Sequence, residues 1–152
     1  MFKKMFRKNE KNEILSQENI RLNQHAASSD EAIVSVGKQL MKAGYIDEPY
    51  INGMLNRDHG LTTYIGNDIA IPHGEYEVKD YVKRTGLAVD VYPDGISWGG
   101  GNVRIVIGIA ATTDEHVRIL QNIAEKLSDM AMVEKVVNGD PKFIYELLTM
   151  EG

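Results

Sequence analysis

The sequence predicts a single α/β domain whose β-sheet is covered by helices on both faces. Segments in which apolar and polar residues alternate are interleaved with segments that have helical spacing, an order typical of α/β folds. Segment 103–111 is almost continuously apolar and rich in β-branched residues, as expected of a central strand covered on both faces. The length of 152 residues fits one domain with its own core.

Two helices are predicted in the N-terminal half of the chain. Ser28 and Glu31 have the spacing of a capping box, so a helix is expected to begin there and to stop at Gly44. Asp47 is a suitable capping residue for a second helix, which is expected to run to about Arg57. The first helix carries an apolar stripe made of Ile33, Val36, Leu40 and Met41.

Alternating residues predict three further strands, at 20–22, 69–73 and 87–91. Pro72 cannot donate a hydrogen bond to a neighbouring strand, so the second of these strands ends there or lies at an edge of the sheet. Residues 93–95 (Pro-Asp-Gly) have turn chemistry and are expected to close the third strand.

Helices are also predicted in the last third of the chain. Thr113 is expected to cap a helix over residues 114–128. Two shorter helices are expected to follow, one ending at Gly139 and one beginning after Asp140. The apolar stripe of the longer helix is predicted to consist of Val117, Leu120, Ile123, Ala124 and Leu127.

Charge is unevenly distributed along the chain. The formal net charge is -5, yet residues 1–13 hold five Lys and Arg against two Glu. We expect residues 1–16 to form a basic, flexible tail and residues 17–152 to form the domain. An acidic domain argues against nucleic acid as a partner and suits a basic protein partner. The sequence shows no signal peptide and no apolar run long enough to span a membrane, which favours a cytoplasmic protein.

Several kinds of catalytic site find no support in the sequence. Cysteine is absent, which excludes a disulfide, a thiol nucleophile and a thiolate metal site. Glycines 99–101 lack the following helix and lysine of a phosphate-binding loop, so we interpret them as a turn between strands. His25 and His59 have no supporting motif and are interpreted as surface or structural residues. His73 and His116 remain.

His73 is the first candidate nucleophile. It lies at the end of the predicted strand 69–73, on the same face as the two isoleucines, between Pro72 and Gly74. The proline fixes the approach of the backbone, and the glycine is expected to leave room for a bulky group beside the imidazole. Neutral imidazole is a competent nucleophile near neutral pH. On spacing alone, a structural role is the more common one for such a histidine.

His116 and Arg57 are two further candidates. His116 lies in the first turn of the helix predicted after Thr113, in line with the apolar stripe, where it could donate a hydrogen bond to an anion at the helix start. Arg57 lies at the end of a predicted helix, and a guanidinium group can bind two oxygens of a phosphate at once, in a bidentate manner. From position alone, a core or capping histidine and a solvated arginine are the more common outcomes.

Six short blocks carry a resemblance to a known family. The first three are 54–58 (MLNRD), 63–67 (TYIGN) and 69–74 (IAIPHG). The next three are 92–95 (YPDG), 107–111 (IGIAA) and 114–116 (DEH). The first group resembles the phosphorylation-site region of mannitol/fructose-type enzyme IIA domains of the bacterial phosphoenolpyruvate-dependent sugar phosphotransferase system, and the second resembles the mannitol branch. The resemblance covers roughly residues 18–150.

This resemblance implies a phosphotransferase component that works through a phosphohistidine. His73 would accept the phosphoryl group from phospho-HPr, His116 would assist, and Arg57 would bind the phosphoryl oxygens. The group would then pass to a cysteine of mannitol enzyme IIB, within the membrane-bound enzyme IICB, for mannitol uptake and phosphorylation. The implied fold is a single α/β domain with a mixed sheet. The resemblance implies no cofactor, no metal and no direct sugar site, and only transient association with the membrane transporter.

The expected mechanism is in-line transfer between two proteins. Arg57, His116 and backbone N–H groups near Gly74 are expected to hold the equatorial oxygens of the phosphoryl group. Glu75 departs from the family pattern, in which a neutral residue is expected after the glycine. An acidic group beside a phosphohistidine would weaken retention of the phosphate unless it points outward.

Three alternatives remain open at this point. A relative of the nitrogen-type regulatory enzyme IIA would use the same histidine but act by phosphorylation-dependent protein binding. A metal-binding or hydrolytic protein would use His73 and His116 as ligands, although no third ligand lies at tight spacing with either. A pure adaptor domain would carry no phosphate chemistry.

Overall fold

The computed structural model describes residues 14–111 and 113–150, with residues 113 and 114 described by their backbone alone. Its centre is a five-stranded sheet in the order β1-β4-β5-β3-β2. The strands are β1 (Ile20–Arg21), β2 (Tyr64–Gly66), β3 (Ile69–Ala70), β4 (Gly86–Trp98) and β5 (Gly101–Ala110). β1 runs parallel to β4 and β3 to β5, whereas β4 and β5, and β2 and β3, are antiparallel. The mixed sheet and the central place of the predicted strand 103–111 are confirmed.

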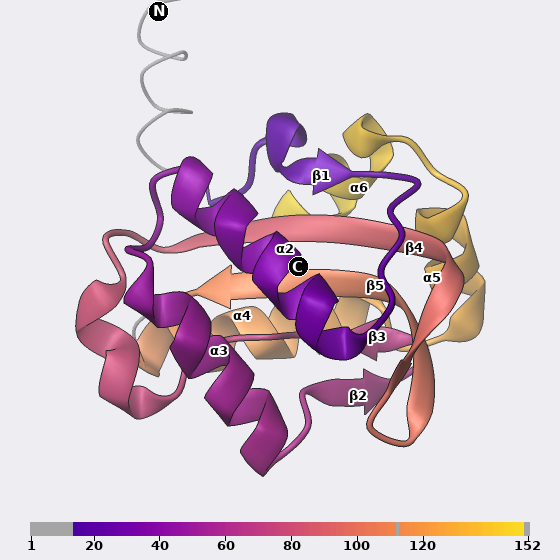
Figure 1. Cartoon of the computed structure of the whole chain (residues 1–152). Coiled ribbons are helices and arrows are strands. Elements are labelled where there is room, and N and C mark those ends of the chain that lie inside the picture. Colours follow the sequence, from indigo (N-terminus) through magenta and orange to yellow (C-terminus); the bar gives the residue numbers. More distant parts are fainter. Residues whose placement is uncertain (1–13, 112, 151–152) are drawn as a thin grey trace, which may run out of the picture.

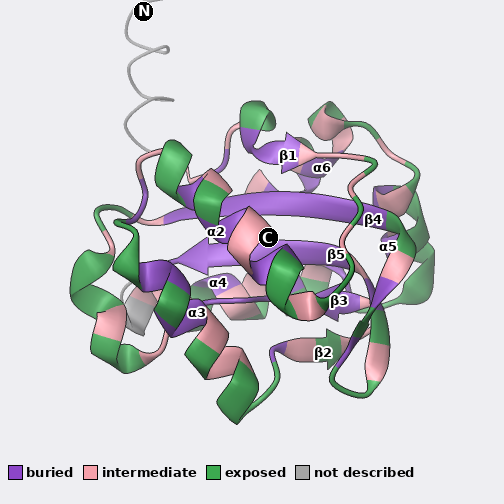
Figure 2. Ribbon diagram, viewed as in Figure 1, coloured by how far each residue is buried: buried purple, intermediate pink, exposed green. Residues whose placement is uncertain are grey.

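Helices cover both faces of this sheet, as predicted (Figure 1). On one face lie α2 (Ser29–Lys42) and α3 (Pro49–Gly60). On the other face lie α4 (Thr113–Lys126), α5 (Met130–Val137) and α6 (Pro141–Thr149). Two short 3-10 helices, η1 (Gln17–Asn19) and η2 (Tyr76–Tyr81), precede β1 and β4. Figure 2 shows that most of β4 and β5 is buried between these layers.

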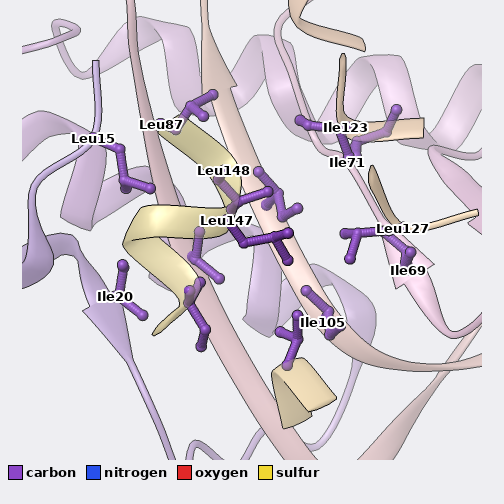
Figure 3. Close-up of a cluster of buried hydrophobic side chains, with 14 of the residues drawn as sticks. Leu15, Ile20, Ile69, Ile71, Leu87, Ile105, Ile123, Leu127, Leu147 and Leu148 are labelled. Atoms are coloured by element: carbon purple, nitrogen blue, oxygen red, sulfur yellow. The ribbon is translucent and has the colours of Figure 1, made fainter. Parts of the chain in front are cut away.

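Each face of the sheet packs into a hydrophobic core of its own, because successive side chains of a strand point to opposite faces. In β5, Ile105, Ile107 and Ile109 belong to the core under α4, α5 and α6. Val106 and Ala110 of the same strand belong to the core under α2 and α3. Figure 3 shows the first core, where side chains of the β3 and β5 region meet those of α4 and α6. Full burial of each isoleucine contributes roughly 1.5–3 kcal/mol.

Side-chain caps begin three of the helices, and two of these caps, Ser28 and Asp140, stand where the sequence predicted a helix start. The Ser28 hydroxyl accepts a hydrogen bond from the N–H of Glu31 (3.2 Å), which fixes the start of α2. Asp129 and Asp140 accept hydrogen bonds of 2.8 Å from backbone N–H groups at the starts of α5 and α6. The predicted end of the first short helix near Gly139 and the predicted start of the second after Asp140 are confirmed.

The predicted cap of α3 by Asp47 is wrong. The residue before the helix is Glu48, whose backbone is already helical and whose side chain makes no capping hydrogen bond. Asp47 therefore lies one position too early, and its carboxylate lies 3.9 Å from the Lys83 ammonium instead. The helix also continues past the expected end near Arg57, as far as Gly60.

The prediction that residues 93–95 close a strand is also wrong. β4 continues through them to Trp98, and a register shift between Val91 and Ile96 absorbs the extra residues. Gly95 permits this irregularity because it adopts a φ of 79°, which L side chains rarely do. The turn comes later, where positive φ angles at Gly99 and Gly100 give a two-residue hairpin, as the run 99–101 predicted.

The buried stripe of α4 differs from the predicted one. Ile119, Ile123 and Leu127 are buried and form a row at spacings of four, whereas Val117 is 55% exposed and Ala124 is exposed. Val117 and Ala124 lie off this row, on the side of the helix that faces away from the sheet. The side chain of Thr113, the predicted cap, lies outside the described residues.

Residues 14–16 pack on the domain, although they were assigned to the N-terminal tail. Leu15 is fully buried, and the carbonyl of Ile14 accepts a hydrogen bond from the N–H of Leu87 (2.7 Å). Residues 1–13 lie outside the described residues, so the flexible tail expected there stays a prediction.

A buried ion pair joins the edge strand β1 to β4. Asp90 has no exposed surface, and its two carboxylate oxygens accept hydrogen bonds from Arg21 Nε (2.8 Å) and Nη2 (2.7 Å). The same guanidinium donates to the carbonyl and hydroxyl oxygens of Ser35 in α2. Burial raises the pKa of Asp90, and Arg21 opposes that rise. The pair fixes β1 in register, at the cost of desolvating both groups.

We predict that Arg21→Ala lowers the free energy of unfolding by about 3–5 kcal/mol, because Asp90 is left buried and unpaired. Urea denaturation at pH 7 measures this loss. The variant should recover part of it at acidic pH, where a carboxyl with a raised pKa keeps its proton in the folded state. Lys83→Ala, which breaks only the exposed pair with Asp47, should cost less than about 1 kcal/mol. Equal losses in the two variants would contradict this account.

Candidate active site

Backbone hydrogen bonds hold the segment that leads to His73 against the central strand. β3 ends at Ala70, so the strand stops before Pro72 rather than lying at an edge of the sheet. The N–H of Ile109 donates to the carbonyl of Pro72 (2.9 Å), and His73 forms an isolated parallel bridge with Ile109. His73 therefore lies at the carboxyl ends of the parallel strands β3 and β5, where α/β sheets commonly bind ligands.

The His73 ring is held in one tautomer. Its Nδ1 lies 2.7 Å from the carbonyl oxygen of Ile71, and a carbonyl oxygen can only accept. Nδ1 must therefore carry the hydrogen, which leaves the lone pair of the neutral ring on Nε2. Only 5% of the His73 surface is exposed, so the ring is far less open than a residue projecting from a strand end.

The structure brings His116 against His73, as the sequence suggested. His116 lies in the first turn of α4, and the two ring centroids are 4.2 Å apart with the planes inclined at 62°. The Nε2 atom of His116 is buried and has no hydrogen-bond partner. A buried polar atom without a hydrogen-bond partner destabilises the folded protein, so its presence here indicates a site for a transiently bound polar group.

Arg57 lies near both rings, in the last turn of α3. Its positive charge lowers the pKa of His73 and that of His116, which places the guanidinium within electrostatic reach of both. Its Nη1 donates a hydrogen bond to the carbonyl of Leu61, in the loop that follows the helix. The three predicted site residues thus come together from α3, the end of β3 and the start of α4.

Burial is the main influence on the two imidazoles. It lowers the pKa of His73 to about 4, with smaller contributions in the same direction from His116 and Arg57. The hydrogen bond to Ile71 and the charge of Asp58 act in the opposite direction. Burial, followed by the charge of Arg57, also lowers the pKa of His116. Both rings are therefore neutral at physiological pH, and His73 keeps a free lone pair.

Gly74 serves a different purpose from the one predicted. A Cβ atom at this position would lie 2.5 Å from the ring of Tyr50 and 2.8 Å from Val78, so the glycine makes room for Tyr50 rather than for a group beside the imidazole. The Tyr50 hydroxyl accepts from the Gly74 N–H (2.9 Å) and donates to the carbonyl of Ile109 (2.8 Å). Burial raises the pKa of Tyr50 to about 12, so the hydroxyl keeps its proton.

The backbone N–H groups of Gly74 and Glu75 already have partners, which counts against the expectation that these two groups hold phosphoryl oxygens. Gly74 donates to Tyr50, and Glu75 donates to the carbonyl of Gly53 (3.2 Å). The Glu75 carboxylate in turn accepts a hydrogen bond from the side chain of Asn56 (2.9 Å) on the exposed surface of α3. This acidic group is therefore held toward α3.

Sequence reasoning missed Tyr50 and Asp58. Neither belongs to a chemical motif, and Tyr50 acts through a contact 59 residues away in the chain. The nearest signal for Asp58 was its place inside the block 54–58, directly after Arg57. Long-range contacts of this kind become visible only when the sheet is assembled.

The other two histidines lie on the surface, as predicted. His59 pairs with Asp30 (2.7 Å), and His25 lies 3.6 Å from Asp94. Within residues 14–111 and 113–150, no three His, Asp or Glu side chains gather as metal ligands do. No helix in the same part of the chain is both long and apolar enough to cross a membrane.

The fold and the paired histidines define a class of small α/β proteins that hold a neutral imidazole at the carboxyl ends of a mixed sheet. Residues 13–150 match the family described as phosphoenolpyruvate-dependent sugar phosphotransferase system, EIIA 2. The chain therefore belongs to this family of phosphotransferase components.

Curated relatives agree with this assignment. The mannitol-specific phosphotransferase enzyme IIA component of Bacillus subtilis is 40% identical over 84% of this chain and 90% of its own length. Other relatives are much longer. The chain spans 33% of a multiphosphoryl transfer protein of Escherichia coli O157:H7 (42% identical over 80% of this chain). It spans 20% of the mannitol-specific EIICBA component of E. coli K12 (39% identical over 82% of this chain).

Solved structures share the fold. Enzyme IIAMTL of E. coli, in a complex with phosphorylated enzyme IIBMTL, has a TM-score of 0.84 and 36% identity, over 90% of this chain and 97% of that one. The nitrogen regulatory protein IIA-Ntr of Neisseria meningitidis has a TM-score of 0.79 over 90% of this chain and 97% of that one. Its identity of 21% supports a common fold alone.

We predict that the histidines titrate in a fixed order. His59 should gain its proton above its ordinary pKa because Asp30 accepts a hydrogen bond from it, whereas His73 should stay neutral until about pH 4. The imidazole ring signals in NMR spectra recorded between pH 8 and pH 4 measure the pKa values of both histidines. Between pH 6.5 and 4 the unfolded chain binds the His73 proton and the folded chain does not, so His73 contributes a loss of stability as the pH falls. A His73 ring that titrates near 6.5 would refute the prediction.

Proposed function

We propose that this protein is a phosphoryl carrier of the sugar phosphotransferase system, which accepts a phosphoryl group on Nε2 of His73. The observation that carries this proposal is the buried, neutral His73 ring with its Nδ1 hydrogen committed to Ile71 and its second nitrogen free. The donor is phospho-HPr, and the acceptor is a cysteine of mannitol enzyme IIB. The protein works without a cofactor or metal and without a sugar site of its own.

The transfer exchanges one P–N bond for another. The Nε2 lone pair of His73 attacks the phosphorus of phosphohistidine on HPr, and the electron pair of the breaking P–N bond returns to the HPr imidazole. Positive charge develops on the His73 ring as its lone pair is consumed. The carbonyl of Ile71 stabilises that charge through the Nδ1 hydrogen bond, which also favours the protonated ring. In the second step the cysteine thiolate attacks phosphorus, and the lone pair returns to Nε2.

Arg57 and His116 supply charge and hydrogen bonds for the transferred group. The guanidinium of Arg57 acts on both rings, and His116 has an unpartnered Nε2 beside His73. A phosphoryl group on His73 would give this buried nitrogen the partner that it lacks. Transition-state charge on the three equatorial oxygens is what such donors stabilise. Burial of the site also keeps bulk water from the labile P–N bond.

The choice of mannitol enzyme IIB rests on the relatives. Proteins named as mannitol-specific match nearly the full described chain at about 40% identity, and the similar E. coli structure was solved with phosphorylated enzyme IIBMTL. The likeness to the nitrogen regulatory protein concerns the fold alone, so the regulatory alternative has less support. We infer a cytoplasmic protein that associates transiently with the membrane transporter.

We predict that His73→Gln abolishes phosphorylation. Incubation of the protein with phosphoenolpyruvate, enzyme I and HPr should give acid-labile, base-stable phosphate on the peptide that contains His73. His59→Gln, which removes an exposed histidine, should be labelled like the wild type. Full labelling of His73→Gln would remove His73 as the acceptor.

We predict that His116→Ala slows transfer to mannitol enzyme IIB by about 100- to 1,000-fold, because one donor to the phosphoryl oxygens is lost. The rate is measured by mixing phosphorylated protein with the IIB domain and following loss of its phosphate. His73 should still accept phosphate in this variant. An unchanged rate would exclude His116 from the site. Failure of the wild type to phosphorylate the IIB domain, despite labelling at His73, would favour the regulatory alternative.

A further inference from the structure

Asp58 makes an unusual set of contacts for a carboxylate near the end of a helix. A single oxygen, Oδ1, accepts hydrogen bonds from the Thr63 N–H (2.8 Å), the Thr63 hydroxyl (2.7 Å) and the Trp98 indole N–H (3.0 Å). Thr63 is 2% exposed and Trp98 is 1% exposed. Asp58 is therefore a fixed junction between the end of α3, the loop before β2 and the end of β4.

This junction connects directly to the His73 ring. The carbonyl of Thr63 accepts a hydrogen bond from the N–H of Ile71 (3.0 Å). The carbonyl of Ile71 accepts one from Nδ1 of His73 (2.7 Å). A path through only two residues, Thr63 and Ile71, thus joins the Asp58 carboxylate to the imidazole. A shift of Thr63 moves the carbonyl that sets the orientation of the His73 ring.

The loop at this junction also contacts Arg57. Arg57 precedes Asp58 in α3, and its guanidinium donates to the carbonyl of Leu61. Residues 61–63 are thus held by Arg57 at one end and by Asp58 at the other. These residues are the connection between α3, which carries Arg57, and the β2–β3 segment, which leads to His73.

We propose that Asp58 is a positioning residue for phosphoryl transfer, which fixes Arg57 relative to the His73 ring through its hydrogen bonds to Thr63 and Trp98. This inference rests on the proposed function of His73. The negative charge of Asp58 raises the pKa of His73, whereas Arg57 and His116 lower it. Removal of the Asp58 charge alone therefore has a separate, electrostatic effect. The positioning role itself needs an acceptor at Oδ1 rather than a charge.

Two variants of Asp58 separate these effects. Asp58→Ala removes the acceptor, whereas Asp58→Asn keeps an amide oxygen that can accept from Thr63 and Trp98. At saturating phospho-HPr, we expect Asp58→Ala to lower the single-turnover rate of His73 phosphorylation by about tenfold or more, since a misplacement near 1 Å costs up to about 100-fold. Asp58→Asn should stay within about threefold of the wild type. Asp94→Ala, which removes an exposed carboxylate, is the matched control and should not change the rate.

Trp98 provides an independent readout because it is the only tryptophan in the chain. Its indole N–H signal in NMR spectra should shift in Asp58→Ala, where the hydrogen bond is lost, and stay in place in Asp58→Asn. Thr63→Val removes only the hydroxyl bond and keeps the backbone N–H, so it should slow transfer by a few-fold even if Asp58→Ala does not fold.

The outcomes separate this inference from the proposed function. Wild-type rates in folded Asp58→Ala, or in Thr63→Val if Asp58→Ala does not fold, would refute the positioning role while His73 remains the acceptor. An Asn variant as slow as the Ala variant would also refute it, because the charge would then be the decisive property. No labelling of the wild-type protein would instead overturn the proposed function itself.

Discussion

The backbone of Ile109 is the constraint on which the site depends. Its N–H donates a hydrogen bond to the carbonyl of Pro72, and its carbonyl accepts one from the hydroxyl of Tyr50. Its side chain is buried in the core beneath α4. One residue of the central strand thus holds in place both the turn that carries His73 and, through Tyr50, the helix α3. Since β5 has neighbouring strands on both edges, this anchor cannot move without disturbing the whole sheet.

The site resolves a conflict between reactivity and charge. Burial keeps the His73 ring neutral, which preserves a lone pair for attack, but burial also disfavours the charged ring that forms once the lone pair is used. The Ile71 carbonyl lessens the second effect without abolishing the first, because it offers a dipole rather than a full negative charge. A carboxylate in the same place would favour protonation far more strongly and so remove the nucleophile at moderate pH.

Much of this arrangement could be predicted from sequence, and the exceptions have physical causes. The alternation around β5, the Ser28 capping box and the proline after β3 are local signals, and they placed the layers and the strand end correctly. Asp47 and residues 93–95 carry equally good local chemistry, but the helix begins too late for Asp47 to cap it, and the β4–β5 pairing carries the strand through residues 93–95. The sequence placed His73, His116 and Arg57 as candidates. It could not show that the Gly74 N–H was already taken, because Tyr50 reaches it through the folded structure.

The packing of Gly74 against Tyr50 and Val78 bears on which residues position 74 can accept. In this protein the last residue of the Pro-His-Gly signature is set by the steric demand of two neighbours, Tyr50 and Val78. A side chain at position 74 would require both Tyr50 and Val78 to give way. Because the Tyr50 hydroxyl is bonded to the central strand through Ile109, such a change would loosen α3 as well as the turn that carries His73.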